Sequence, residues 1–310
     1  MQEGNKKAII AAFFANLGIS VAKFTGFFIT GAASMLAEGV HSLADSGNQG
    51  LLLLGGSRSR RQANAEHPFG YGRERYFWAF VVSLVLFSLG GLFAIFEGVE
   101  KLRHPHELES PAVAVGILIV AIGLETFSLR TAVREANHVR GDQGWWQFIR
   151  RSKSPELPVV LLEDIGAEVG LFLALTGVVV AEVTGNARWD AAGSLGIGVL
   201  LVVIAGLLAV EMKSLLIGEG AGAADEASIR TAIEGTPHVR RLIHVRTQHL
   251  GPDELLVAAK IELDADLSVA DVAAAIDAAE KRLRSAVHST LIVYLEPDLA
   301  RTVAGRTLSR

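Results

Sequence analysis

Six long apolar stretches make up most of the first 217 residues of this chain. A helix that crosses the hydrocarbon core of a bilayer needs about 20 consecutive, mostly apolar residues. Backbone polar groups find no water there, so a helix is the expected conformation. Of the 310 residues, 50% are hydrophobic, and the mean hydropathy is +0.38. We therefore predict a six-helix transmembrane domain over residues 1–217, with spans at 8–30, 33–55, 76–99, 111–131, 158–182 and 190–213.

The composition changes at about residue 218, where the apolar stretches end. Shorter runs with helix and strand patterns follow, and Gly251 and Pro252 mark a turn between two of them. Ser268 is the predicted N-cap of the longer helix. An order of helix, strand, strand, helix, strand is typical of a small two-layer α+β domain, here of ferredoxin-like type. We place this domain at residues 218–300, before a polar tail at 301–310, with elements at 226–235, 242–248, 255–263, 269–286 and 290–295.

Positive charges are concentrated in the connections after the second and fourth spans, whereas the connection after the fifth span contains only Arg188. Lys and Arg favour cytoplasmic loops, so we predict that both termini are cytoplasmic, with the protein in a bacterial inner membrane. Gly31 and Ala32 leave room for only a tight turn between the first two spans. Residues 137–157 are predicted to be flexible, with Trp145 and Trp146 as candidate anchors at the membrane interface.

The composition also excludes several functional classes. The chain has no Cys, which rules out disulfides, thiolate metal sites and cysteine catalysis. Its net charge of −4 argues against a nucleic-acid partner. The first apolar stretch is too long for the core of a signal peptide and lacks a clear cleavage site, so we expect it to be retained. Any metal ligands must therefore be His, carboxylate or amide groups.

The second span carries polar side chains on one face. His41 and Asp45 are four residues apart, and Asn48 continues the same face. Ionisable groups inside a membrane are costly and usually functional. An imidazole nitrogen beside a carboxylate oxygen suits zinc and neighbouring divalent metals. The span therefore predicts half of a metal site.

The fifth span carries Glu163, Asp164 and Glu168. Asp164 and Glu168 share a face, whereas Glu163 is rotated from Asp164 by about 100°. Acids this close repel one another in a medium of low dielectric, and protons or a bound cation relieve the repulsion. We predict a tetrahedral site in which the second and fifth spans meet, formed by His41, Asp45, Asp164 and either Glu168 or Asn48. The alternative is a hydrogen-bonded polar seam that only joins the helices.

Two further ionisable residues lie within predicted spans: Lys23 in the first and Glu125 in the fourth. Each is a candidate for lining a transport route or relaying protons. The two can equally pair with other polar groups as part of the structure, and the sequence does not separate these roles.

Several motifs occur in an order that resembles the cation diffusion facilitator family. They are SMLAEGVHSLADSGNQ (34–49), HPFGYGRER (67–75) and DAAGSLGIG (190–198), followed by the α+β tail. The resemblance implies a transporter rather than an enzyme, with no permanently bound cofactor. It also implies a homodimer that exports a divalent metal ion by alternating access, in exchange for protons. Proton exchange is consistent with metal binding, because ligands must lose their protons to bind a metal.

The chain departs from the family pattern in the fifth span, where a His usually precedes the Asp by four residues. That position is Val160 here, so Glu163, Glu168 or Asn48 would replace the missing ligand. More oxygen ligands would favour harder ions such as manganese, with iron and cobalt as further alternatives, while His41 favours zinc. His67 and His244 are candidate peripheral ligands, although a loop-closing role is preferred for His67. The tail site is expected to be weak or absent, because Lys260 and Leu295 lie near its other positions.

Three other functions remain open from the sequence. A membrane metal hydrolase lacks support, since neither a His-Glu-x-x-His run nor a nucleophile elbow around a Ser occurs. A metal sensor or scaffold would bind the ion without moving it. A channel would conduct passively, independent of protons.

Overall fold

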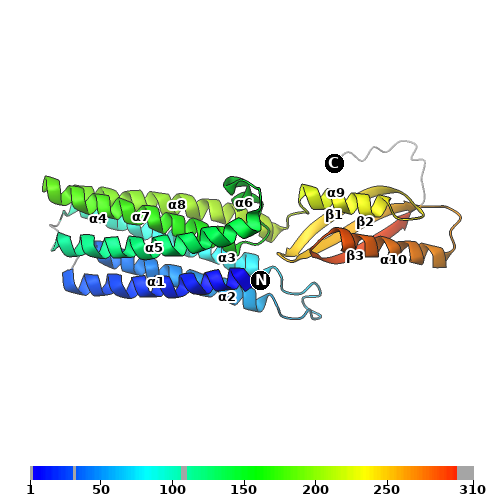
Figure 1. The fold of residues 1–310 in the computed structure, drawn as a ribbon, viewed down its shortest axis with the longest axis horizontal. Coiled ribbons are helices and arrows are strands. Elements are labelled where there is room, and N and C mark those ends of the chain that lie inside the picture. The colour runs from blue at the N-terminus through cyan, green and yellow to red at the C-terminus, as the bar shows by residue number, and fades with distance from the viewer. Residues whose placement is uncertain (1–2, 31–32, 106–109, 299–310) are drawn as a thin grey trace. The chain divides into compact units, whose positions relative to one another are not determined.

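A computed structural model describes residues 3–30, 33–105 and 110–298, and the predicted turn at Gly31 and Ala32 and the tail at 301–310 lie outside these ranges. The chain divides into two compact units, Met1–Leu216 and Ile217–Arg310. Figure 1 shows a bundle of long helices for the first and a small sheet with two helices for the second. The fold is thus a helical membrane domain plus a small α+β domain, as predicted.

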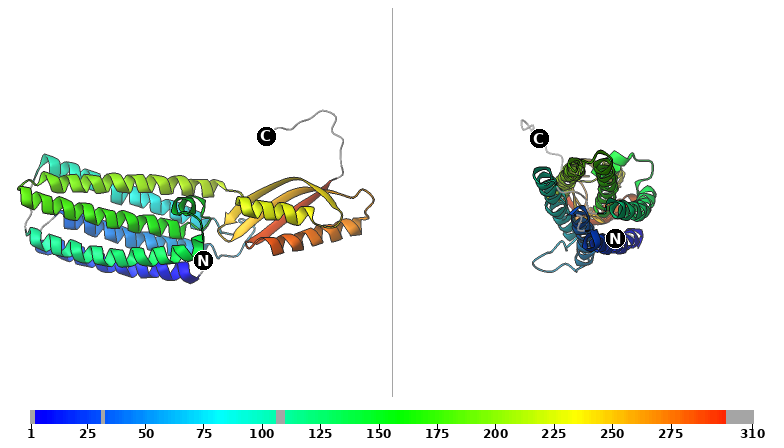
Figure 2. Two further views of the ribbon diagram at one scale, coloured as in Figure 1. Left: turned by 45° about the horizontal axis from the view of Figure 1, so that its top comes forward. Right: turned by 90° about the vertical axis from the view of Figure 1, so that its left-hand side faces the viewer.

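The described residues of the first unit form six long helical segments, which are bundled side by side, as Figure 2 shows. The segment Glu74–Arg103 is continuous but contains a π-helical turn, η1, between α3 and α4. The other long helices are uninterrupted over their described residues. The bounds are α1 (Glu3–Thr30), α2 (Ala33–Arg58), α3 (Glu74–Val85), η1 (Leu86–Leu92), α4 (Phe93–Arg103), α5 (Pro111–Arg140), α7 (Glu156–Thr184) and α8 (Arg188–Ile217).

Four of the six predicted spans are long and apolar enough to cross a bilayer: Glu74–Arg103, Pro111–Arg140, Glu156–Thr184 and Arg188–Ile217. Helix α1 contributes a shorter apolar part, Asn16–Ile29, among the described residues. Helix α2 is 26 residues long, but polar residues interrupt its apolar sequence. The helix that carries Asp45 and Asn48 therefore combines a length sufficient for a span with several polar positions.

Glycines allow the third and sixth spans to pack closely. A Cβ atom on Gly91 of η1 would lie 2.6 Å from the Val202 side chain of α8. A Cβ atom on Gly198 of α8 would lie 2.6 Å from the Ile95 side chain of α4. Neither distance is tolerated by real atoms, so a larger residue would push the helices apart. These glycines therefore serve helix packing.

The prediction that residues 137–157 are flexible is wrong. Helix α5 continues to Arg140, and a short helix, α6 (Trp145–Arg151), follows. Phe148 of α6 is buried against Ala136 and Leu157. The Arg140 guanidinium carbon lies 4.5 Å from the centre of the Trp145 ring. Burial of one aromatic side chain and this cation–π contact stabilise a helix that is too short to form alone.

The second unit contains α9 (Ala223–Glu234), β1 (Val239–Gly251), β2 (Glu254–Leu263), α10 (Val269–Ala286) and β3 (Thr290–Asp298). The sheet order is β1-β2-β3, with β1 antiparallel and β3 parallel to β2. Its core includes Ile229, Ile261 and Leu283. Ser268 caps α10 as predicted, in a capping box with Asp271.

Candidate cation site

Buried polar side chains of the first unit gather where α1, α2, α5 and α7 contact one another. Helical spacing puts each set on one face of its helix, because residues three or four apart are neighbours. Buried polar groups are costly in a membrane unless they are paired or functional. The set comprises Asn16, Ser20 and Lys23 of α1; Ser42, Asp45, Asn48 and Gln49 of α2; Glu125 and Ser128 of α5; and Glu163 and Asp164 of α7.

Helices α2 and α7 meet through Glu163. The amide nitrogen of Asn48 donates a hydrogen bond to one oxygen of the Glu163 carboxyl group. Glu163 also interacts with the carboxyl group of Asp45, and Asp45 interacts electrostatically with Asp164. Neighbouring carboxyl groups in a medium of low dielectric are stable only with a proton or a cation between them. The contact between the two helices is thus a place where positive charge is favoured.

Asp164 and Glu168, the other two acids in the middle of α7, face α5. Ser128 Oγ donates to Asp164 Oδ2 at 3.1 Å, and Thr126 Oγ1 donates to Glu168 Oε1 at 2.8 Å. Asp164 is 1% exposed. Glu168 is only half-buried. The four-residue spacing explains why Asp164 and Glu168 point to the same helix, while the rotation of about 100° turns Glu163 towards α2.

Several buried oxygen atoms in this cluster have no hydrogen-bond partner among the side chains that the structure describes: Asn48 Oδ1, Glu125 Oε1, Glu163 Oε2, Asp164 Oδ1 and Glu168 Oε2. Leaving one such acceptor unsatisfied costs about 1–3 kcal/mol, and more for a charged group. A cation or added protons would satisfy them. The arrangement therefore creates a requirement for positive charge that these described side chains do not meet.

The predicted site also includes His41 and the position of the missing His, Val160. The side chain of His41 lies outside the part of the structure that is described. Val160, at the position of the missing His, is buried in the apolar core of the bundle. Among the described side chains, no three His, Asp or Glu groups are arranged to hold a metal ion. The described carboxylates therefore do not by themselves form a metal centre.

The two peripheral candidates lie in other places. His67 is exposed in the connection between α2 and α3, where its backbone N–H donates to Asn64 Oδ1 at 2.7 Å and its ring centre lies 4.5 Å from that of Tyr71. These contacts support the loop-closing role. His244 is exposed on β1 opposite Lys260, which forms ion pairs of 2.9 Å with Glu296 and Asp298. A fixed ammonium group at this place disfavours a metal ion.

Sequence reasoning missed the neutral partners of the cluster and one ion pair. Ser42 and Ser128 each lie three residues from an acid on the same helix, Asp45 and Glu125, and this spacing was the available signal. The ion pair joins Arg75 of α3 to Glu156 of α7, both buried, through Nε–Oε1 and through an Nη2–Oε2 contact of 2.9 Å. The two residues are 81 positions apart, and no local pattern connects them.

Buried acids between the helices of a multi-pass membrane protein are typical of a cation or proton pathway. The family model for the cation efflux transmembrane domain matches residues 9–217, and that for the cytoplasmic domain of cation efflux proteins matches residues 222–298. The chain is therefore a member of the cation diffusion facilitator family. This family consists of cation transporters and not of enzymes.

The proteins that this chain resembles have names that refer to metal or cation transport or tolerance. The mouse protein named proton-coupled zinc antiporter SLC30A9, mitochondrial, is 31% identical over 84% of this chain and 47% of its own length. Metal tolerance protein C4 of Arabidopsis thaliana is 29% identical over 86% of this chain and 58% of its own length. The cation-efflux pump FieF of Klebsiella pneumoniae is 25% identical over 94% and 92%. The chain thus spans about half the length of the first of these relatives.

Proposed function

We propose that this protein exports a divalent metal cation, with zinc as the preferred substrate, in exchange for protons. The single observation that carries the proposal is the contact between α2 and α7, where Asp45, Asn48, Glu163 and Asp164 meet in a buried cluster with unsatisfied oxygen atoms. The names of the relatives, which include a zinc antiporter and a cation-efflux pump, support the same substrate class.

Competition for the same oxygen atoms would couple the ion to protons. A carboxyl group that holds a proton cannot offer that oxygen to a metal, and a bound metal expels the proton. The cluster lies between two helices. If the helices close towards one face of the membrane, the cluster stays accessible from the opposite face only. His41 would add the nitrogen ligand that favours zinc over manganese, iron and cobalt.

The assembly and location of the protein are argued from its charge distribution and its relatives. We propose a homodimer with both termini in the cytoplasm, a membrane domain at residues 1–217 and a cytoplasmic domain at 218–300. The Lys and Arg distribution supports this orientation. The mouse relative is named as mitochondrial, whereas the FieF relative comes from the bacterium Klebsiella pneumoniae. We propose a bacterial inner membrane as the location, as for a bacterial protein of this family.

Flux measurements test the function. The purified protein in proteoliposomes with an internal zinc dye should show zinc movement that follows the imposed pH gradient. Asp164→Ala and His41→Ala should abolish this flux in a folded protein, whereas Glu182→Ala, an exposed acid further along α7, should retain it. The same assay with manganese, cobalt and iron ranks the substrates. Passive flux independent of pH would indicate a channel, and zinc binding without flux would indicate a sensor.

Stability measurements separate a transport site from a polar seam. Asp164 is surrounded by other acids, and its replacement by Asn keeps the shape of the side chain while removing a charge. In a transport site, Asp164→Asn should lose zinc binding with an unchanged or higher melting temperature, because the repulsion is relieved. A seam that only joins helices predicts the reverse, a lower melting temperature with transport retained.

A further inference from the structure

Helix α1 places a lysine beside the acid cluster. Lys23 is 3% exposed, and its Nζ donates to Ser42 Oγ of α2 at 2.8 Å. Lys23 also interacts electrostatically with Glu125 of α5, a residue that is equally buried. An ammonium group in a membrane interior is costly without compensating negative charge. Glu125 supplies that compensation from the facing helix.

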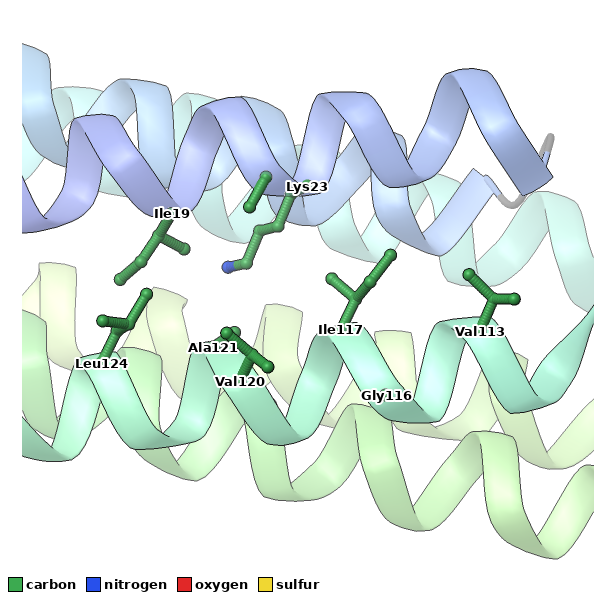
Figure 3. A pocket seen from close by; sticks show the side chains of 9 residues that line it. Ile19, Lys23, Val113, Gly116, Ile117, Val120, Ala121 and Leu124 are labelled. Atoms are coloured by element: carbon green, nitrogen blue, oxygen red, sulfur yellow. The ribbon is translucent and has the colours of Figure 1, made fainter.

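The surroundings of Lys23 leave it room to move. A cavity of about 370 Å³ lies between α1 and α5, and Lys23 is the charged member of the nine residues that line it. Figure 3 shows the lysine side chain extending from α1 towards α5, into the space beside Ile117 and Ala121. A long side chain that borders open space can change its rotamer without displacing packed neighbours. The position of this positive charge is therefore adjustable.

Glu125 connects the lysine to the candidate ligands. It lies one turn beyond Ala121 on the same face of α5. Its carboxyl group interacts electrostatically with Asp164 and Asp45 as well as with Lys23. The charges that face it are thus Lys23 of α1, Asp45 of α2, and Asp164 and Glu168 of α7. A positive charge on one side of Glu125 and a cation on the other compete for the same carboxylate.

On the basis of the proposed cation site, we propose that Lys23 and Glu125 form a counter-charge pair that sets the affinity of this site. Glu125 strengthens cation binding by adding negative charge near Asp45 and Asp164. Lys23 weakens it by holding part of that charge. The site then releases its substrate fast enough for transport, which an uncompensated cluster of acids would not.

Zinc binding to the full-length protein in detergent, measured by calorimetry, tests the pair. Lys23→Met should lower the dissociation constant by about tenfold, and Glu125→Gln should raise it by about tenfold, as expected for one nearby charge. The double variant should bind within about threefold of the parent, because both charges are gone. Lys23→Arg should retain the parent affinity. Lys213→Met, the same change at an exposed position on α8, should leave binding unchanged.

Flux gives a second readout that a purely structural lysine would not produce. In proteoliposomes, Lys23→Met should lower both KM and kcat for zinc, since tighter binding slows release. The counter-charge pair would be overturned if Lys23→Met weakened zinc binding. It would also be overturned if the zinc affinity of the double variant did not return towards that of the parent. Should Lys23→Met fail to fold, Glu125→Gln with unchanged affinity overturns it alone.

The same titrations separate this inference from the proposed function. No zinc binding by the parent, or full binding by Asp164→Asn, refutes the cation site itself. Zinc binding that is lost in Asp164→Asn but unaffected by Lys23→Met and Glu125→Gln refutes only the counter-charge pair.

Discussion

The two units of this protein place their charges in opposite ways. In the membrane unit, acids such as Asp164 and Glu163 are buried, with oxygen atoms that no described side chain satisfies. In the second unit, ion pairs lie at or near the surface, as in the 2.8 Å contact of Arg240 with Asp264. The interior of the second unit is an apolar core around Leu283 and Ile261.

The difference shows what each unit is built to do. A buried acid with an unsatisfied oxygen atom destabilises a fold, so its presence indicates a function that requires it. A surface ion pair contributes little to stability, so an apolar core must stabilise the second unit. Substitutions should therefore distinguish the two units. Replacing an acid of the cluster should impair function without destabilising the protein, whereas replacing a core residue of the second unit should destabilise it. The following predictions test this contrast, from the largest effect to the smallest.

The buried ion pair of the membrane unit should behave unlike its acid cluster. Arg75 and Glu156 satisfy each other, so removing one leaves an uncompensated buried charge. Arg75→Met should cost about 3–5 kcal/mol, visible as a lower melting temperature in detergent. The double variant Arg75→Met/Glu156→Leu should recover most of this loss. An unchanged melting temperature in Arg75→Met would show that the ion pair contributes no more to stability than the acids of the cluster do.

The core of the second unit should respond to lost volume. Leu283 of α10 is 0% exposed, and Leu283→Ala leaves a cavity that should cost about 2–5 kcal/mol. Hydrogen exchange of the β2 amides in the full-length protein measures the loss. Val269→Ala, at a position that is 88% exposed on the same helix, is the matched control and should change stability by less than about 0.5 kcal/mol. Equal protection in both variants would argue against an apolar core as the main source of stability.

The capping box of α10 should contribute a smaller amount. Ser268 Oγ accepts a hydrogen bond from the Asp271 backbone N–H at 3.3 Å. Ser268→Ala should cost about 1 kcal/mol, seen as faster hydrogen exchange in the first turn of α10, and Ser268→Asp should restore most of the protection. Ser285→Ala, near the other end of the same helix, is expected to leave that turn unchanged. Fast exchange in the Asp variant as well would assign the effect to something other than the cap.

Acid should remove one surface contribution of the second unit. Hydrogen bonds from Arg240 and then His238 hold the pKa of Asp264 below its ordinary value of 3.8. A carboxyl group with a lowered pKa stabilises the folded state at pH values above its ordinary pKa. This contribution is lost as the pH falls through the pKa of the folded state. Protection around Asp264 should therefore fall below about pH 4, by a small amount because the pair is exposed. Asp264→Asn should weaken this pH dependence, and an identical acid profile in that variant would exclude Asp264 as its source.

The general fold was predictable because its signals are local. Apolar length predicts helices that span a bilayer, alternation predicts strands, and Ser268 before a helical run predicts a cap. Helix α6 was not predictable in this way. It depends on the burial of Phe148 against Ala136 and Leu157, a contact that a polar-looking sequence does not reveal.

The site was predictable only in part for the same reason. The spacing of Asp164 and Glu168 correctly indicates a shared face, and both contact α5. The spacing does not indicate which helix that face meets. Glu163, which the spacing turned away from the others, is the acid that hydrogen-bonds to α2 through Asn48.

By itself, the sequence determined the positions of the long helices, their polar faces, the α+β tail and the absence of thiolate ligands, since each depends on neighbouring residues or on composition. Only the tertiary structure decided which acid faces which helix, where Lys23 points and that Arg75 meets Glu156. Those pairings join residues far apart in the chain, and they depend on how whole helices rotate and pack against one another, which no local pattern encodes.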